Sequence, residues 1–307
     1  MSSLYITHPD CHLHDMGEWH PESPQRLDAV QDQLIMSGVL DTLESCTARA
    51  AGDADLLRVH TPGHLQFLKD HSPARGRYAV DPDTAMNPHT LAAARVAAGA
   101  GLCAVDALMA RTHSTAFCAV RPPGHHASPG RAGGFCFFNN IAVAAAYALE
   151  VHGLERVAII DFDVHHGNGT EDAFAGDGRV LMCSFYQYPL YPGTRHDPAA
   201  DNMINIPVPA GTGGAELRRI VNHEWMPRLD TFAPQMLFIS AGFDAHREEE
   251  LAEMTMVEND YAWITRRLVD LAARTAEGRI VSMLEGGYSL SALGRSVVAH
   301  LKAFDEI

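Results

Sequence analysis

The chain has 307 residues, of which 47% are hydrophobic and 20% are charged, a balance typical of a globular protein with an ample core. Its formal net charge of −15 argues against a broad nucleic-acid-binding surface, because such a surface needs basic patches. An acidic surface would instead attract a cationic substrate. We find no internal repeat and no linker rich in Gly or Ser, so we expect a single domain over residues 1–307.

Three features favour a cytoplasmic protein that does not enter a membrane. The first residues, Met1–Tyr5, lack the basic and apolar regions of a signal peptide. The most apolar long run, Leu91–Ala110, is interrupted by Arg95 and Asp106, and we interpret it as a core helix rather than a membrane span. None of the six cysteines forms a C-x-x-C pair, which indicates reduced thiols. A homo-oligomer is compatible with all of this.

The first third of the chain predicts a strand followed by helices. The elements expected there are a strand at Leu4–His8 and helices at Arg26–Leu40, Asp55–Val59 and His64–Leu68. Further on, Asn87 and Pro88 suit the N-cap and the first position of a helix over His89–Arg111, since proline is tolerated where no backbone N–H is needed. Asp81 and Asp83 lie in the loop before this helix.

From residue 116 onward, apolar strands alternate with helices. The expected strands are Ala116–Val120, Val157–Ile160, Val180–Cys183, Met236–Ser240 and Ile280–Leu284. The expected helices are Asn140–His152, Ala215–Leu229, Glu258–Ala276 and Ser291–Phe304. This alternation predicts βαβ units and an α/β fold with a mostly parallel sheet. Functional groups in such sheets gather beyond the carboxyl ends of the strands.

A metal site is predicted from polar residues that end two of these strands. Asp163 and His165 are two residues apart, so their side chains leave the same face of an extended segment, whereas His166 points to the other face. With Asp244 they would form the three-ligand set of a hydrolytic site, which keeps one position open for water. Two carboxylates make the set oxygen-rich for zinc, so Fe(II), Co(II) and Mn(II) remain alternatives.

Acid–base groups are predicted from the adjacent His125 and His126. Both need orienting partners, and Asp161 and Asn168 are available. A carboxylate behind one imidazole favours its charged form, while an amide behind the other fixes its orientation with less effect on charge. One histidine would then act electrostatically and the other would cycle a proton. Tyr288 could donate a hydrogen bond to a developing oxyanion.

Five segments occur in the order and spacing of a known family, from about residue 5 to about residue 300. They are RPPGHHA at 121–127, GFCFFN at 134–139, DFDVHHGNG at 161–169, SAGFDAH at 240–246 and EGGY at 285–288. Together they resemble the signature of the zinc-dependent histone deacetylase superfamily, which includes acetylpolyamine amidohydrolases and acetoin-utilisation proteins. Asn168 and the segment His20–Glu22 resemble class II and bacterial members. The resemblance implies an arginase-like three-layer fold with a central parallel sheet of about eight strands.

The resemblance also implies residue roles. Zinc would be bound by Asp163, His165 and Asp244. His126 would be the general base and then the acid, His125 backed by Asp161 its electrostatic partner, and Tyr288 would polarise the scissile carbonyl. The acyl tunnel would be formed by Phe135 and Tyr191 with Gly134 and Gly286, and Asp81 or Asp83 would lie at its rim. A structural potassium site would use Asp161, Asp163, His165, Ser184 and Phe185, and part of a second would use Phe174, Asp177 and Val180.

The implied reaction is hydrolysis of an acetyl or other short acyl amide, which gives acetate and a free amine. Protein acetyl-lysine, acetylpolyamines and small acetylated metabolites all remain candidate substrates. A dinuclear manganese ureohydrolase of the same fold is a rival, although Asn168 stands where a carboxylate for a second metal would be needed. An inactive acetyl-lysine-binding scaffold is a second rival, opposed by the complete set of catalytic side chains.

Overall fold

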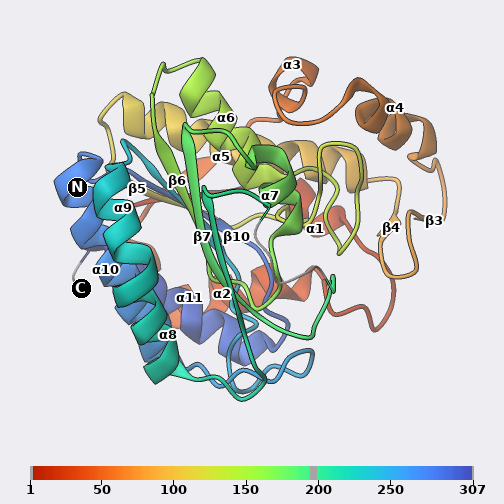
Figure 1. Ribbon diagram of the computed structural model, residues 1–307. Helices are drawn as coiled ribbons and strands as arrows, with labels where there is room; N and C mark the ends of the chain where they lie inside the picture. The colour runs from red at the N-terminus through yellow and green to blue at the C-terminus, as the bar shows by residue number, and fades with distance from the viewer. Residues whose placement is uncertain (1–2, 194–198, 306–307) are drawn as a thin grey trace.

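The computed structural model describes residues 3–193 and 199–305, and its centre is an eight-stranded sheet in which every strand pair is parallel (Figure 1). The strand order is β2-β1-β5-β10-β9-β6-β7-β8. The strands are β1 (Leu4–Thr7), β2 (Glu44–Thr47), β5 (Thr115–Cys118), β6 (Val157–Asp161), β7 (Val180–Gln187), β8 (Met203–Val208), β9 (Leu237–Ala241) and β10 (Ile280–Leu284). A separate antiparallel pair is formed by β3 (Tyr78–Ala79) and β4 (Ala85–Met86). The predicted α/β class is confirmed.

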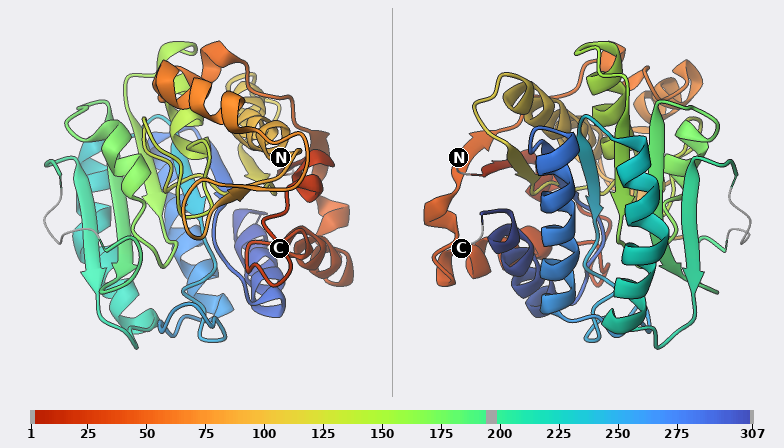
Figure 2. Two further views of the ribbon diagram at one scale, coloured as in Figure 1. Left: turned by 90° about the vertical axis from the view of Figure 1, so that its right-hand side faces the viewer. Right: turned by 60° about the vertical axis from the view of Figure 1, so that its left-hand side comes forward.

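Helices cover both faces of this sheet and give three layers (Figures 1 and 2). They are α1 (Asp10–Leu13), α2 (Gln25–Met36), α3 (Asp53–Leu56), α4 (Pro62–His71), α5 (Thr90–Met109), α6 (Asn140–Glu150), α7 (Asn168–Phe174), α8 (Gly214–Ile220), α9 (Met226–Phe232), α10 (Glu258–Thr275) and α11 (Leu290–Asp305). One face is covered by α5 and α6, and the other by α2 and α8 to α11 (Figure 1).

The central strands were visible in the sequence because both of their faces are buried. Every residue of β5, β6, β7, β9 and β10 is buried, so each reads as a nearly continuous apolar run. The edge strands β2 and β8 were not predicted. Strand β2 is mostly exposed, and β8 alternates and contains Pro207, so neither carries a continuous apolar signal.

Several helix boundaries differ from the predicted ones: α3 is Asp53–Leu56, α6 ends at Glu150, and the predicted helix Ala215–Leu229 is divided by a π-helical turn at Val221–Trp225. Two further differences have a local cause. The prediction of Asn87 as an N-cap was wrong: α5 begins at Thr90 with His89 at the N-cap. Asn87 instead closes a turn ahead of the helix, because its Oδ1 atom accepts hydrogen bonds from the His89 N–H (3.0 Å) and the Thr90 hydroxyl (3.0 Å). Helix α2 ends at Met36 rather than Leu40, since Gly38 takes the left-handed conformation (φ 71°) that ends helices.

Helix α5 is long and apolar enough, by length and composition alone, to cross a membrane. In this fold it packs against α1, α6, β5 and β10, and most of its residues are buried. This packing agrees with its interpretation as a core helix.

The topology brings four strand ends together. Strands β5, β10, β9 and β6 are consecutive neighbours in the sheet, although they are far apart in the chain. Because they are parallel, the residues that follow their carboxyl ends lie along one edge of the sheet. These residues are the histidine pair after β5, Tyr288 after β10, Asp244 after β9 and the acidic segment after β6.

Candidate active site

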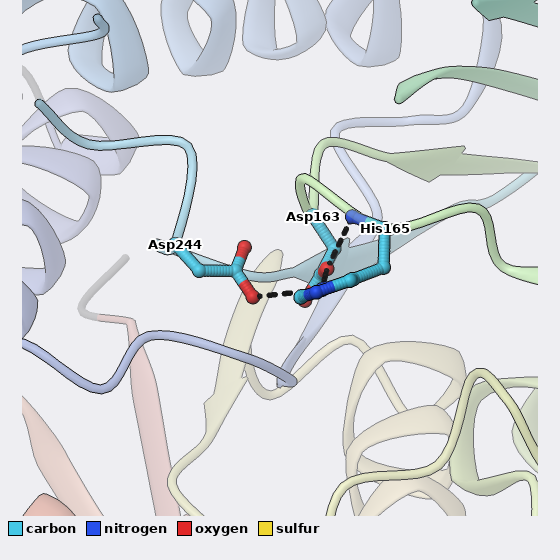
Figure 3. Close-up of side chains that lie close together, drawn as sticks. All are labelled: Asp163, His165 and Asp244. Carbon is cyan, nitrogen blue, oxygen red and sulfur yellow. Dashed lines mark hydrogen bonds and ion pairs between the residues drawn. The ribbon is translucent and has the colours of Figure 1, made fainter. Parts of the chain in front are cut away.

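Asp163, His165 and Asp244 form a compact cluster at this edge (Figure 3). The Nδ1 atom of His165 lies 2.9 Å from Oδ1 of Asp163 and 3.2 Å from Oδ2 of Asp244. One ligand atom from each residue lies within 4.8 Å of the others, and both carboxylates are fully buried. The structure therefore brings the three predicted metal ligands together.

The bonding of the cluster fits a divalent cation. Asp244 accepts the Val164 N–H through Oδ1 (2.9 Å), whereas its buried Oδ2 has no hydrogen bond within the described residues and only the 3.2 Å ion-pair contact with Nδ1 of His165. Burial and the nearby charge of Asp163 raise the pKa of Asp244 to about 6. Two buried carboxylates, Asp163 and Asp244, thus share one imidazole nitrogen, and buried negative charges are costly unless more positive charge compensates them. A metal ion of the hydrolytic kind would supply that charge.

Two glycines are required beside the cluster. A Cβ atom at Gly242 would lie 2.0 Å from Oδ2 of Asp163, and one at Gly286 would lie 1.9 Å from Oδ2 of Asp244. No other residue fits at either position without displacing a carboxylate. Gly286, which was predicted as a tunnel residue, also donates its N–H to Oδ2 of Asp163 (2.8 Å) and so borders the metal ligands.

The histidine pair has the predicted partners. The Nδ1 atom of His125 lies 2.9 Å from Oδ2 of Asp161, and that of His126 lies 2.8 Å from Oδ1 of Asn168. Although burial alone would lower it, the charges of Asp161 and Asp163 raise the pKa of His125 well above its ordinary value. Burial and the positive charge of His125 hold the pKa of His126 well below that value. At neutral pH the pair therefore contains one charged and one neutral imidazole.

Tyr288 follows the end of β10. Its ring meets the ring of Phe135 edge-on, with centroids 5.8 Å apart, and the guanidinium carbon of Arg26 lies 4.9 Å from its centroid. Burial raises the pKa of Tyr288 well above its ordinary value, so the phenol keeps its proton and can donate a hydrogen bond. Phe135 also contacts the ring of His20, with centroids 4.7 Å apart.

The remaining predicted tunnel residues lie beside His126. The ring of Tyr191 meets that of His126 edge-on at 4.9 Å. Gly134 (φ 56°) lies against both rings, since a Cβ atom there would be 2.6 Å from His126 and 2.7 Å from Tyr191. A Cβ atom at Gly133 would lie 3.0 Å from the Asp81 carboxylate and 3.5 Å from the Tyr191 hydroxyl, so both side chains adjoin Gly133. Asp81 in turn accepts the N–H of Asp83 (3.0 Å).

Glu285 is a buried residue of the site to which sequence reasoning gave no role. Its Oε2 atom accepts the N–H groups of Gly124 (2.7 Å) and His125 (3.1 Å), and its Oε1 atom accepts the Ser240 hydroxyl (3.2 Å). Burial raises its pKa to about 7, although the charge of His125 opposes the rise. Its place in the EGGY segment was the only signal in the sequence.

Glu249 was also missed. Its Oε2 atom accepts the N–H groups of Tyr288 (2.8 Å) and Ser289 (3.1 Å), and its Oε1 atom accepts the N–H of Glu250 (3.0 Å). Since Glu249 lies in the loop that follows Asp244, one carboxylate ties the metal-ligand loop to the tyrosine loop. The sequence signal for Glu249 is the run of three glutamates at 248–250, which follows the predicted metal ligand Asp244 by a few residues.

A fully buried ion network lies behind Tyr288. Glu22 accepts hydrogen bonds from Arg26 (3.1 Å to Oε1) and Arg121 (2.7 Å to Oε2), and all three residues are completely buried. Arg26 also donates to the carbonyl oxygen of Gly287 (2.7 Å). The network thus attaches the loop before α2 to the loop that carries Tyr288. The sequence did not predict this burial, because charged residues in a loop that contains prolines are usually exposed.

The first predicted potassium set is also brought together. Asp161 and Ser184 are directly paired across β6 and β7, with Phe185 next along β7. Asp163 and His165 follow β6 directly. His166 lies apart from the metal cluster, with Nε2 at 2.6 Å from Oε2 of Glu171. Of the second set, the carbonyl oxygens of Phe174, Asp177 and Val180 all face the side-chain amide of Asn202.

Comparison with known proteins agrees with this geometry. Residues 20–304 match the family model "Histone deacetylase domain". A "Probable deacetylase" from Archaeoglobus fulgidus is 34% identical over 98% of this chain and 86% of its own length. A "Histone deacetylase-like amidohydrolase" from Pseudomonas aeruginosa is 38% identical over 88% of this chain and 73% of its own length. Among solved structures, the HD domain of HDA15 superposes with a TM-score of 0.91 at 33% identity, covering 99% of this chain and 88% of that one.

The family match spans nearly the whole chain and includes all four strand ends that build the site. The chain therefore belongs to the histone deacetylase family.

Proposed function

We propose that the chain is a metal-dependent amidohydrolase that removes acetyl or other short acyl groups from amine nitrogens, releasing acetate and the free amine. The observation that carries this proposal is the close approach of three different parts. These are the three-ligand cluster, the histidine pair and the loop that carries the phenol of Tyr288. Nε2 of His125 lies 3.8 Å from Oδ2 of Asp163, and the ring centroids of His126 and His165 are 5.8 Å apart. The Gly286 N–H, two residues before Tyr288, donates to Oδ2 of Asp163. Together they supply a metal site, a general base and an oxyanion donor, the groups that serve metal-assisted amide hydrolysis.

We propose zinc as the ion that Asp163, His165 and Asp244 hold, with Fe(II), Co(II) and Mn(II) as the alternatives that this donor set admits. When bound, such an ion polarises the amide carbonyl and lowers the pKa of water. A structural K⁺ at the first potassium set belongs to the same proposal.

His126 is the proposed proton carrier. Since an amide oxygen can only accept, Nδ1 of His126 carries the proton and donates a hydrogen bond to Oδ1 of Asn168, and Nε2 is left with a free lone pair. Nε2 takes a proton from the attacking water and later gives it to the leaving amine. His125 stays charged beside it and favours the build-up of negative charge. The Tyr288 hydroxyl donates to the developing oxyanion.

The ring pair Phe135 and Tyr191 is the proposed wall of the acyl tunnel, and Asp81 its rim residue. A narrow aromatic passage suits the unbranched chain of acetyl-lysine. The neighbouring carboxylates Asp81 and Asp83 favour a cationic substrate, so an acetylpolyamine is the second candidate. A ureohydrolase is not favoured, because Asn168 faces His126 rather than the metal cluster. We further propose that residues 1–307 act as one cytoplasmic catalytic domain, and the free cysteines agree with a reducing compartment.

The test is acetate release by the purified, metal-loaded chain from acetyl-lysine peptides, N-acetylputrescine and N-acetylspermidine, with His126→Ala as the matched inactive control. The proposal expects acetate from at least one substrate and none from the control. Absence of acetate release from all of them, or release of urea from guanidino compounds, would overturn it.

A further inference from the structure

Three backbone carbonyl oxygens converge on one side-chain nitrogen beyond the active site. The Nδ2 atom of Asn202 lies at hydrogen-bond distance from the carbonyl oxygens of Phe174 (2.9 Å), Asp177 (3.1 Å) and Val180 (2.9 Å), so its two N–H groups are shared among three acceptors. These carbonyls come from the end of α7, the turn after it and the first residue of β7. Asn202 directly precedes β8.

The same three carbonyls are those that resemblance to the family implies for a second potassium ion. Converging carbonyl dipoles repel one another unless positive charge lies between them, which is how carbonyl cages bind K⁺. In this chain the amide N–H₂ group instead places the partial positive charge of its hydrogens between the carbonyls. Its nitrogen lies at hydrogen-bond distance from all three oxygens and so occupies the point where a cation would have to sit.

The orientation of the amide is fixed by its other bonds. Oδ1 of Asn202 accepts the N–H of Gly176 (2.9 Å), and the backbone carbonyl of Asn202 accepts the N–H of Met182 (2.9 Å). A flipped amide would set Oδ1 against three carbonyl oxygens and Nδ2 against an N–H group. The hydrogen-bond network therefore assigns nitrogen, not oxygen, to the cage.

The charges around Asn202 do not favour a cation either. A pocket of about 630 Å³ borders Asn202, and its charged lining residues are Arg156, Arg228 and Asp201. The carboxylate of Asp177 is itself engaged by Arg179, with Nη2 at 2.7 Å from Oδ2. Two guanidinium groups beside the pocket make an added positive charge less stable.

The first potassium set differs in this respect. Within the described residues no side-chain amide donates to the carbonyls of Asp161, Asp163 or His165, and the Ser184 hydroxyl donates to Oδ1 of Asn205 (2.8 Å). We propose that the side-chain amide of Asn202 replaces the second potassium ion, so that this chain binds a structural monovalent cation only at the first set. This inference concerns the structural cations and does not depend on the substrate or the reaction.

The experiment uses Tl⁺ as a probe for K⁺. Crystals of the intact chain and of Asn202→Ala are soaked in Tl⁺, and anomalous scattering locates the ion. We expect no Tl⁺ among the carbonyls of Phe174, Asp177 and Val180 in the wild type, and a Tl⁺ peak there once the amide is removed. Tl⁺ in the wild-type cage would overturn the proposal, and so would an empty cage in Asn202→Ala.

A solution measurement covers the case in which the alanine variant does not crystallise. The midpoint of thermal unfolding is recorded against KCl, with choline chloride holding ionic strength constant. We expect Asn202→Ala and Asn202→Asp to gain a K⁺ dependence beyond that of the wild type, because each opens the cage to a cation. The aspartate variant adds a carboxylate and should show the larger gain. Equal K⁺ dependence in all three proteins would contradict the proposal.

Discussion

The Nδ1 atom of His126 lies 2.8 Å from an amide oxygen, that of Asn168, whereas the Nδ1 atom of its neighbour His125 lies 2.9 Å from a carboxylate oxygen, that of Asp161. This difference of partner separates two adjacent imidazoles by charge. The carboxylate keeps His125 protonated, and the amide orients His126 without adding negative charge. In the proposed reaction His126 therefore transfers the proton, whereas His125 stays charged.

Replacing the Asn168 amide by a carboxylate tests whether this partner sets the pKa of His126. Asn168→Asp places a negative charge behind His126 and should raise its pKa. The base must be neutral to accept a proton, so activity is lost as pH falls through that pKa. We therefore expect the acidic limb of the pH profile of kcat/KM to move to higher pH, by roughly one unit or more. Asn168→Ala is the control and should lower kcat without that upward movement. An unchanged acidic limb in the aspartate variant would contradict the assigned role of His126.

Removal of the Tyr288 hydroxyl tests the oxyanion donor. Tyr288→Phe keeps the ring contacts with Phe135 and Arg26 but loses the donated hydrogen bond. We expect kcat to fall by roughly 10²–10³-fold, with metal content unchanged. Tyr191→Phe is the matched control, since that residue contributes its ring to the tunnel wall, and we expect it to keep most activity. If Tyr288→Phe retained near-wild-type turnover, another group would have to stabilise the oxyanion.

Glu249 should act through Tyr288, because its carboxylate accepts the tyrosine N–H. Glu249→Ala should lower kcat by roughly 10- to 100-fold with a smaller change in KM, since small displacements of a catalytic group are costly. Glu249→Gln keeps an acceptor oxygen and should restore part of the loss. In a chain that already carries Tyr288→Phe, Glu249→Ala should lower kcat little further. Additive losses in the double variant would show that Glu249 supports the fold in general rather than Tyr288.

Glu285 should make stability depend on pH. Its folded pKa of about 7 lies above the ordinary value of 4.5, so the folded chain binds a proton that the unfolded chain releases between these values. This group therefore destabilises the fold as pH rises from about 4.5 to about 7, by an amount on the order of 3 kcal/mol. Glu285→Gln should flatten that part of the curve of unfolding free energy against pH. Parallel curves for the two proteins in urea titrations would contradict the raised pKa.

The sequence predicted those parts of the molecule that have a local signal. Strand β6 ends in polar residues at period-two spacing, so Asp163 and His165 could be paired from their spacing alone. The predicted partners of the two histidines also proved correct. Contacts such as Glu22 with Arg121, or Glu249 with Tyr288, join loops far apart in the chain and follow no periodic pattern. Strand β2 was missed because its residues are mostly exposed, and its place is set by pairing with β1 alone.

The central claim is metal-dependent hydrolysis at the cluster of Asp163, His165 and Asp244, and one measurement tests it most directly. The purified chain is stripped of metal with a chelator and titrated with Zn²⁺ while acetate release from an acetylated substrate and bound zinc are both recorded. We predict that activity is lost on stripping and returns in proportion to zinc, reaching its maximum at one ion per chain, and that Asp244→Asn neither binds zinc tightly nor recovers. Acetate release that persists in the stripped chain, or that needs two ions per chain, would contradict the account.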